Sequence, residues 1–142
     1  MHKILITDEL SPQGLAQLAQ AEDVTFDVVT GLTPETLAAH IKGYDGLIVR
    51  SSVSVTEPVL AAADRLKVVG RAGVGVDNIN VPAASMRGII VMNTPGANTI
   101  ATAEHTLAML LALCRNIPQA YTRLKQGHWE RKKFMGIQLS RK

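Results

Sequence analysis

The first 97 residues alternate short apolar runs with amphipathic stretches. Apolar runs fall at 3–7, 24–29 and 46–49, and stretches with helical spacing at 11–22 and 33–44 separate them. Short apolar runs bounded by polar turns predict strands, and the longer amphipathic stretches predict helices. A hydroxyl followed by proline opens both helices, at Ser11-Pro12 and Thr33-Pro34, which is a typical start signal. The order is therefore strand, helix, strand, helix, strand.

The alternation continues to residue 92. A short helix is expected after Thr56, and it is followed by a strand at 67–70, a glycine-rich turn, a helical turn at 81–86 and a strand at 88–92. Apolar strands joined by helices predict a parallel sheet covered on both faces, with functional loops at the carboxyl ends of the strands. Residues 1–97 are thus expected to form one doubly wound α/β domain with a five-stranded sheet.

The pattern changes after residue 97. Asn98 or Thr99 is expected to cap a helix from about Ile100 to Arg115 that is apolar nearly all round, and such a helix is normally buried. Pro118 should kink or restart this helix, and Gly127 is a plausible left-handed cap at its end. No clear element is predicted for 128–142. We interpret 98–142 as the incomplete start of a second domain, whose cover is missing from the chain.

Composition and charge restrict the possible classes of protein. Hydrophobic residues make up 46% and charged residues 19%, and every apolar run is too short to cross a bilayer. We therefore expect a cytoplasmic protein without membrane contact. Cys114 lies in an apolar helical pattern and is predicted to be buried and inert, so neither a disulfide framework nor a zinc site is expected.

The charge is distributed unevenly along the chain. Residues 1–97 contain 7 basic and 10 acidic side chains, whereas residues 98–142 contain 8 basic and 2 acidic ones. A basic tail can bind nucleic acid, but no interleaved aromatic residues and no nucleic-acid-binding module accompany it. A solvated or interface face is the preferred interpretation, and nucleic acid is not an expected partner.

Two arginines follow neighbouring strands of the predicted sheet. Arg50 comes directly after the third strand, and Arg71 ends the fourth, within the segment GRAGVGVDNIN. Glycines 70, 73 and 75 leave backbone amides open to an anion. A lone arginine would more often be solvated, but two of them beside an amide-rich turn indicate an anion-binding site.

Competing interpretations of the same loops are weaker. The turn GVGVDN has G-x-G spacing after a strand, but Asn78 occupies the place of the third glycine and no long helix follows, which disfavours a dinucleotide site. Asp77 and Asn78 are then predicted to be turn and cap residues. Asp8 and Glu9 resemble the acidic pair of a receiver domain, but Arg50 stands where its phosphoacceptor would be, so they are interpreted as loop and helix-capping residues. The four histidines are expected to be structural or solvated.

The chain resembles the D-isomer-specific 2-hydroxyacid dehydrogenase family, of the phosphoglycerate type, over its whole length. The resemblance rests on GLIVRSS, VVGRAGVGVDNI, GIIVMNTPGANTIATAEHTLAMLLALCRNIP and GHWERKKFMG. It implies a flavodoxin-like substrate domain at 1–97 and, at 98–142, the first helix and tail of a Rossmann domain. It also implies NAD as cofactor and 3-phosphoglycerate as substrate in a longer parent protein. The family's dinucleotide fingerprint, catalytic arginine, glutamate and histidine do not occur in this sequence, so the chain alone is expected to be inactive.

The resemblance also implies roles for individual residues. Arg50 and Ser51 would approach the substrate, the amides near Gly73 and Val74 would face its carboxylate, and Val74 would also border the nicotinamide. Arg71 would lie nearby or instead brace the turn. Asn98 is a further expected site residue, at the inter-domain hinge. A homo-oligomer joined through 98–142 is also expected, in which Arg131 and Lys132 of one subunit would lie at the phosphate site of its partner. The rival hypothesis is a non-enzymatic corepressor-like or small-anion-binding module of the same superfamily.

Overall fold

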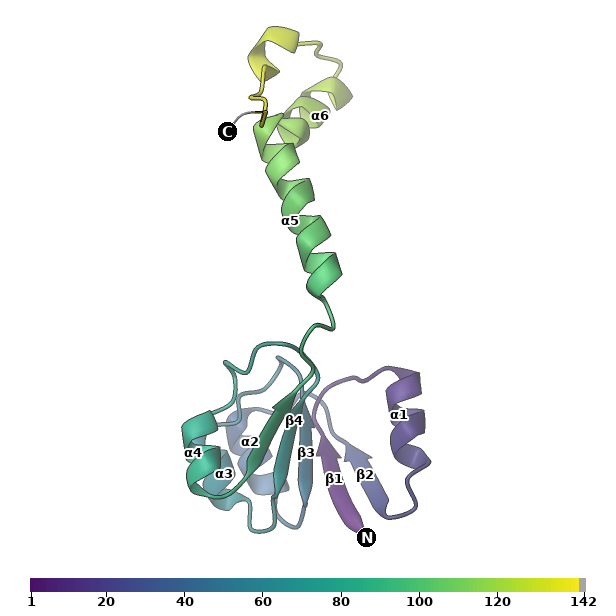
Figure 1. The fold of residues 1–142 in the computed structure, drawn as a ribbon, viewed down its shortest axis with the longest axis vertical. Helices are drawn as coiled ribbons and strands as arrows, with labels where there is room; N and C mark the ends of the chain where they lie inside the picture. The colour runs from purple at the N-terminus through teal and green to yellow at the C-terminus, as the bar shows by residue number, and fades with distance from the viewer. Residues whose placement is uncertain (141–142) are drawn as a thin grey trace. The chain divides into compact units, whose positions relative to one another are not determined.

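The chain folds into two compact units, Met1–Ala97 and Asn98–Lys142. The computed structural model describes residues 1–140 (Figure 1). Among these residues, no helix combines the length and the apolar composition needed to span a bilayer.

The first unit is built on one parallel sheet. Its strands are β1 (His2–Ile6), β2 (Val24–Val28), β3 (Gly46–Val49), β4 (Val68–Arg71) and β5 (Ile90–Asn93). They form a five-stranded sheet in the order β2-β1-β3-β4-β5, in which every pair is parallel. This is the flavodoxin-like order, whose switch point lies between β1 and β3. The predicted doubly wound α/β fold class is confirmed.

Local start signals place the helices between these strands. They are α1 (Pro12–Ala19), α2 (Pro34–His40), α3 (Glu57–Ala62) and α4 (Val81–Met86). The Ser11 hydroxyl accepts a hydrogen bond from the N–H of Gly14 at 3.2 Å, as the sequence predicts. Thr33 and Thr36 cap reciprocally, because each side chain accepts from the other's N–H, at 3.3 Å and 2.8 Å. Both helices therefore begin where the hydroxyl-proline pairs predict.

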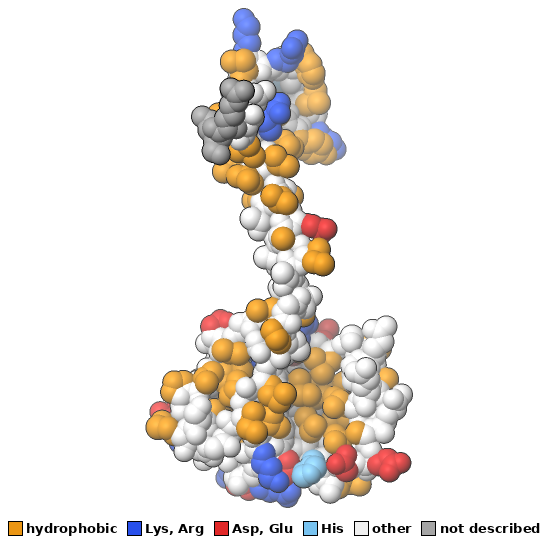
Figure 2. Space-filling model, in the orientation of Figure 1, with side chains coloured by type: hydrophobic (Ala, Val, Ile, Leu, Met, Phe, Trp, Pro, Cys, Tyr) orange, Lys and Arg blue, Asp and Glu red, His pale blue; other side chains and the backbone are white. Residues whose placement is uncertain are grey.

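The core of this unit lies mainly on one face of the sheet. Fully buried Leu5, Leu47 and Val69 pack with residues of α2, α3 and α4 in one cluster. By contrast, α1 contains no buried residue, and Ile90 and Met92 of β5 are 62% and 59% exposed. Figure 2 shows hydrophobic side chains open to solvent between α4 and α1. The expectation that both faces of the sheet are covered was therefore only half right.

Residues 98–140 of the second unit form two helices and one short turn of 3₁₀ helix. These are α5 (Thr99–Cys114), α6 (Ile117–Lys125) and η1 (Arg131–Phe134). Asn116 has a positive φ of 53° between α5 and α6, and proline stands in the first turn of α6, so the chain restarts there. Gly127 has φ 82°, and the N–H groups of Gly127 and His128 donate to α6 carbonyls at 2.9 Å and 3.0 Å. The predicted left-handed cap is confirmed.

One prediction for this unit was wrong, because η1 lies in a stretch for which no element was expected. α5 was expected to be apolar nearly all round and to lack its cover within this chain, and its exposure agrees with that. Cys114 is its one buried residue, and Leu107, Leu110 and Leu113 are 59%, 42% and 73% exposed. Cys114 is covered because the chain returns to it, with the N–H of Ile137 donating to its carbonyl at 2.8 Å. The rest of the helix finds no cover among residues 98–140.

Candidate anion-binding site

A cavity of about 690 Å³ lies at the carboxyl edge of the sheet in the first unit. Its lining comes from the loop after β1, from α1 and from the ends of β3, β4 and β5, and includes Glu9, Ser11, Ile48, Arg50, Arg71 and Met92. Carboxyl ends of parallel strands beside a switch point are the usual place for a ligand in this architecture. The structure thus brings Arg50 and Arg71 into one cavity, as the strand order predicts.

The backbone of Arg50 is fixed by two neighbouring loops. Its N–H donates to a carboxylate oxygen of Asp8 at 2.8 Å, and its carbonyl accepts from the side-chain amide of Asn78 at 2.8 Å. The side chain itself is exposed and forms no ion pair with any carboxylate in residues 1–140. Its guanidinium therefore keeps its donors for a ligand.

Asp8 has a different role from the expected helix cap. Its side chain is buried, with the residue 9% exposed, and it also accepts from the Thr7 hydroxyl at 3.2 Å. Burial by itself would raise the pKa of Asp8. Hydrogen bonds from the Arg50 N–H, from Ser52 and from Thr7 outweigh burial and hold the pKa below its ordinary value. Asp8 is an ionised anchor for the loop after β3, while the capping of α1 belongs to Ser11.

This depressed pKa predicts a loss of stability in acid. A carboxylate with a lower pKa in the folded state contributes stability above its unfolded pKa of about 3.9, and the contribution disappears as pH falls through the folded value. Asp8→Asn should lower the free energy of unfolding by about 1–3 kcal/mol at neutral pH. Urea unfolding of the wild type and of Asp8→Asn, at neutral pH and at about pH 3, measures the difference between their free energies of unfolding. This difference should be smaller in acid. Glu22→Gln, which changes an exposed acid, serves as the control. A difference in unfolding free energy that does not depend on pH would contradict the role of Asp8 as an ionised anchor.

Arg71 both lines the cavity and braces the turn that follows it. Its Nε donates to Oδ1 of Asn78 at 2.9 Å. Its guanidinium lies directly over Gly73, where an added Cβ would overlap Nη1 and meet Cζ at 3.1 Å. The two alternatives left open for Arg71 are therefore compatible: one edge of the guanidinium holds the turn, and the terminal amino groups remain for the cavity.

The glycine-rich turn supplies fewer free amides than its sequence suggests. The N–H of Gly73 donates to the Arg71 carbonyl at 2.9 Å, so this N–H already has a hydrogen-bond partner within the turn. Among residues 1–140, the N–H groups of Val74 and Gly75 have no hydrogen-bond partner. The turn is held from β5, because the Asn93 side chain donates to the Val74 carbonyl at 2.7 Å. The Val74 side chain is 42% exposed.

Of the expected site residues, Arg50 and Arg71 line this cavity, whereas Gly73, Val74 and the remaining ones do not. Ser51 is exposed on the loop after β3 and does not line the cavity. Asn98 precedes α5 in the second unit; its carbonyl accepts from Thr102 at 2.9 Å, but its side chain forms no cap hydrogen bond. The four histidines are absent from the cavity lining, and residues 1–140 contain no cluster of acids, histidines or cysteine that could hold a metal ion.

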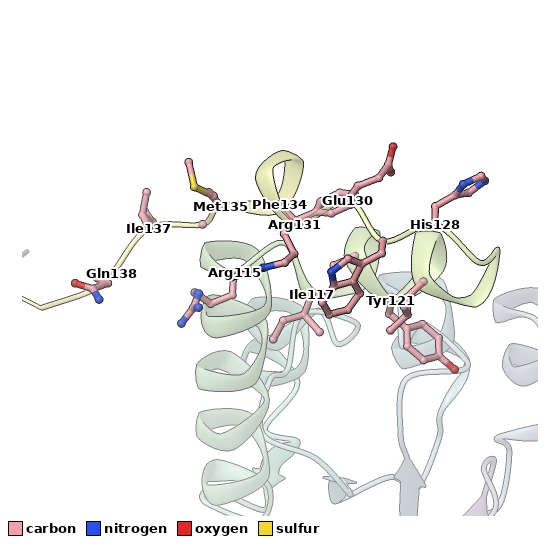
Figure 3. Close-up of a pocket in the computed structure, with 14 residues that line it drawn as sticks. Arg115, Ile117, Tyr121, His128, Glu130, Arg131, Phe134, Met135, Ile137 and Gln138 are labelled. Atoms are coloured by element: carbon pink, nitrogen blue, oxygen red, sulfur yellow. The ribbon is translucent and has the colours of Figure 1, made fainter.

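A second hollow of about 810 Å³ lies within the second unit, between α6 and the segment that follows it (Figure 3). Tyr121, Trp129, Arg131 and Phe134 are among its lining residues. Glu130 is paired with Arg123 at 2.8 Å and with Lys133 at 3.7 Å. Arg131 and Lys132, both exposed in η1, are left without an ion pair among the residues that the structure describes.

Sequence reasoning missed the function of two asparagine side chains. Asn78 lies in a turn, as expected, and its side chain also connects three segments. The cap of α4 is instead Asn80, whose side chain accepts from Ala83 at 3.0 Å. No role was predicted for Asn93. An asparagine after a glycine-rich turn is a sequence signal for side-chain bonding to backbone. It does not reveal which distant carbonyl is bound.

Comparison with known proteins places this architecture in a class. The model of the D-isomer specific 2-hydroxyacid dehydrogenase catalytic domain matches residues 4–133. The chain belongs to the D-isomer specific 2-hydroxyacid dehydrogenase family. Within it, the chain is 52% identical over 139 residues to D-3-phosphoglycerate dehydrogenase of Methanocaldococcus jannaschii, covering 98% of this chain and 26% of that protein.

Solved structures agree with this assignment. A Thermus thermophilus protein superimposes with a TM-score of 0.82 at 33% identity, covering 96% of this chain and 45% of that one. The NAD⁺-bound 3-phosphoglycerate dehydrogenase of Entamoeba histolytica superimposes with a TM-score of 0.71 at 29% identity, covering 80% and 39%. The chain thus spans about a quarter of the length of the curated relative and less than half of each of these solved chains.

Proposed function

We propose that residues 1–97 form the substrate-binding domain of an NAD-dependent D-3-phosphoglycerate dehydrogenase, and that residues 98–142 begin its nucleotide-binding domain. The observation that carries this proposal is the cavity in which Arg50 and Arg71 lie at the ends of adjacent strands without acidic partners among residues 1–140. A small acid with a carboxylate and a phosphate is the matching ligand. The similarity to D-3-phosphoglycerate dehydrogenases supports 3-phosphoglycerate as that acid.

In this proposal the chain contributes recognition of the substrate. Arg50 and Ser51 approach the substrate from the loop after β3, and Arg71 adds a second guanidinium. The N–H groups of Val74 and Gly75, which have no partner among residues 1–140, face the carboxylate. NAD, bound by a longer parent protein, would supply the acceptor for the hydride on the C2 hydroxyl carbon. The exposed Val74 side chain offers an apolar contact that suits the face of a nicotinamide ring.

The second unit has its own part in the proposal. In a homo-oligomer joined through 98–142, Arg131 and Lys132 would contact the phosphate of a substrate bound to the partner subunit. The exposed apolar surface of α5 supports such an interface, because a surface of this kind normally faces a partner. Asn98, directly before α5, is proposed as the hinge residue between the two domains.

Replacement of Arg50 tests the proposed site. Arg50→Ala should weaken binding of 3-phosphoglycerate to the 142-residue chain roughly ten- to hundredfold, because hydrogen bonds to charged groups contribute about 1.5–3 kcal/mol. Titration followed by NMR chemical shifts gives the dissociation constant. Arg65→Ala is the matched control, since Arg65 pairs with Asp45 at 3.0 Å before β3, at the opposite edge of the sheet. An unchanged dissociation constant with a lower melting temperature would show that Arg50 is structural.

A further inference from the structure

The Asn78 carboxamide uses both of its donors and its carbonyl oxygen in hydrogen bonds to two other segments. Its Nδ2 donates to the carbonyls of Arg50 and Val53, each at 2.8 Å, and its Oδ1 accepts from Nε of Arg71 at 2.9 Å. The partners fix the orientation of the amide, because two carbonyls can only accept and an arginine can only donate. One side chain therefore connects the loop after β3 to the arginine that ends β4.

This connection determines which nitrogen atoms of Arg71 can bind a ligand and where the Arg50 side chain leaves the backbone. Nε is the guanidinium nitrogen nearest the chain, so its bond to Asn78 fixes the plane of the Arg71 guanidinium and leaves both terminal amino groups free. Gly73 allows the guanidinium to approach the turn closely, because any Cβ there would overlap it. At Arg50, Asn78 holds the carbonyl while Asp8 holds the N–H at 2.8 Å. The backbone from which the Arg50 side chain projects is thus fixed on both sides.

Closing the turn does not require these side-chain contacts. Backbone bonds already join the two loops: the N–H of Val55 donates to the Asn78 carbonyl at 2.8 Å, and the N–H of Asn80 donates to the Val55 carbonyl at 2.9 Å. A residue needed only for this bridge would not have to contact Arg71. The Asn78 side chain adds a fixed relation between the two arginines, and a binding site with fixed donors loses less entropy when a ligand binds.

We propose that Asn78 is a positioning residue, which holds the Arg71 guanidinium and the Arg50 backbone so that both arginines contact one small acid with a carboxylate and a phosphate. The inference rests on the proposed function of the cavity. It assigns to Asn78 a role in affinity that is separate from its contribution to the stability of the fold.

The test compares two asparagines that lie two residues apart. Asn78→Ala and Asn80→Ala both remove a structural carboxamide, but Asn80 caps α4 and touches neither arginine. Each variant of the 142-residue chain is titrated with 3-phosphoglycerate, and its melting temperature is recorded. Asn78→Ala should raise the dissociation constant about tenfold. Asn80→Ala should lower the melting temperature without changing the dissociation constant.

A double-mutant cycle shows whether Asn78 acts through Arg71. In the background of Arg71→Ala, Asn78→Ala should weaken binding by less than it does alone, because part of its effect requires the guanidinium. If Asn78→Ala does not fold, Asn78→Ser replaces it: this variant keeps a small, uncharged polar side chain but loses the carboxamide that joins Arg71 to the Arg50 loop. It should also bind more weakly than the wild type.

The outcomes separate the inference from the function on which it rests. If Arg50→Ala and Arg71→Ala weaken binding while the Asn78 variants bind like the wild type, the positioning role is wrong and the proposed site stands. Equal losses of affinity for Asn78→Ala and Asn80→Ala would assign both to general destabilisation and would also overturn the inference. If neither arginine matters for binding, the proposed function fails, and the inference fails with it.

Discussion

A mixture of the pure 142-residue chain, NAD and 3-phosphoglycerate is expected to form no NADH above the rate of a protein-free solution. Hydride transfer from a hydroxyl carbon needs a positioned base and a bound cofactor, and enzymes gain about a millionfold or more from such arrangements. No histidine lines the cavity, and its charged lining residues are Glu9, Arg50 and Arg71. The chain should therefore bind substrate without oxidising it.

The same reasoning applies to cofactor binding. The turn after β4 has only the first glycines of a dinucleotide fingerprint, its Gly73 amide is committed to a carbonyl, and it leads into the six-residue helix α4. Calorimetric titration with NAD should give no measurable heat of binding. The full-length Methanocaldococcus jannaschii relative is the positive control in both assays. Formation of NADH by the chain that depends on 3-phosphoglycerate would contradict this prediction.

Self-association through α5 is the second large effect expected. Leu110→Glu combined with Leu113→Glu should convert an associated chain into monomers, because it places charges on side chains that are 42% and 73% exposed in the single chain. Burying a leucine contributes about 1.5–3 kcal/mol, and in a two-fold interface each substitution is present in both subunits. The association constant should therefore fall more than a thousandfold, which corresponds to roughly 4 kcal/mol of association free energy. Sedimentation equilibrium over a range of concentrations measures it.

The control for this experiment lies on the same helix. His105→Glu introduces one glutamate, against two in the leucine variant, at an exposed position that is already polar. It should weaken association much less than the double leucine variant does. An interface built on these leucines would be excluded by either of two results. The wild-type chain could be monomeric at all concentrations, or the double variant could associate as strongly as the wild type.

Much of the fold could be predicted from the sequence because it depends on neighbours along the chain. The sequence predicts each strand to within about two residues of its observed bounds, since apolar runs of four to six residues between polar turns have few alternatives. Ser11, Thr33 and Gly127 mark helix ends because their contacts lie within five residues. The meeting of Arg50 and Arg71 also followed from sequence, because β3 and β4 are neighbouring parallel strands.

What the sequence by itself determined was therefore the fold class, the family and the edge of the sheet at which Arg50 and Arg71 meet. Only the tertiary structure decided how that edge is held together. Asp8 bonds to a residue 42 positions away, and Asn78 bonds to one 28 positions away. Neither pairing leaves a local pattern, because a buried carboxylate or amide takes whichever partner the packing brings near. The same physical reason explains α5: its composition predicts burial, but whether an apolar helix is buried depends on what packs against it.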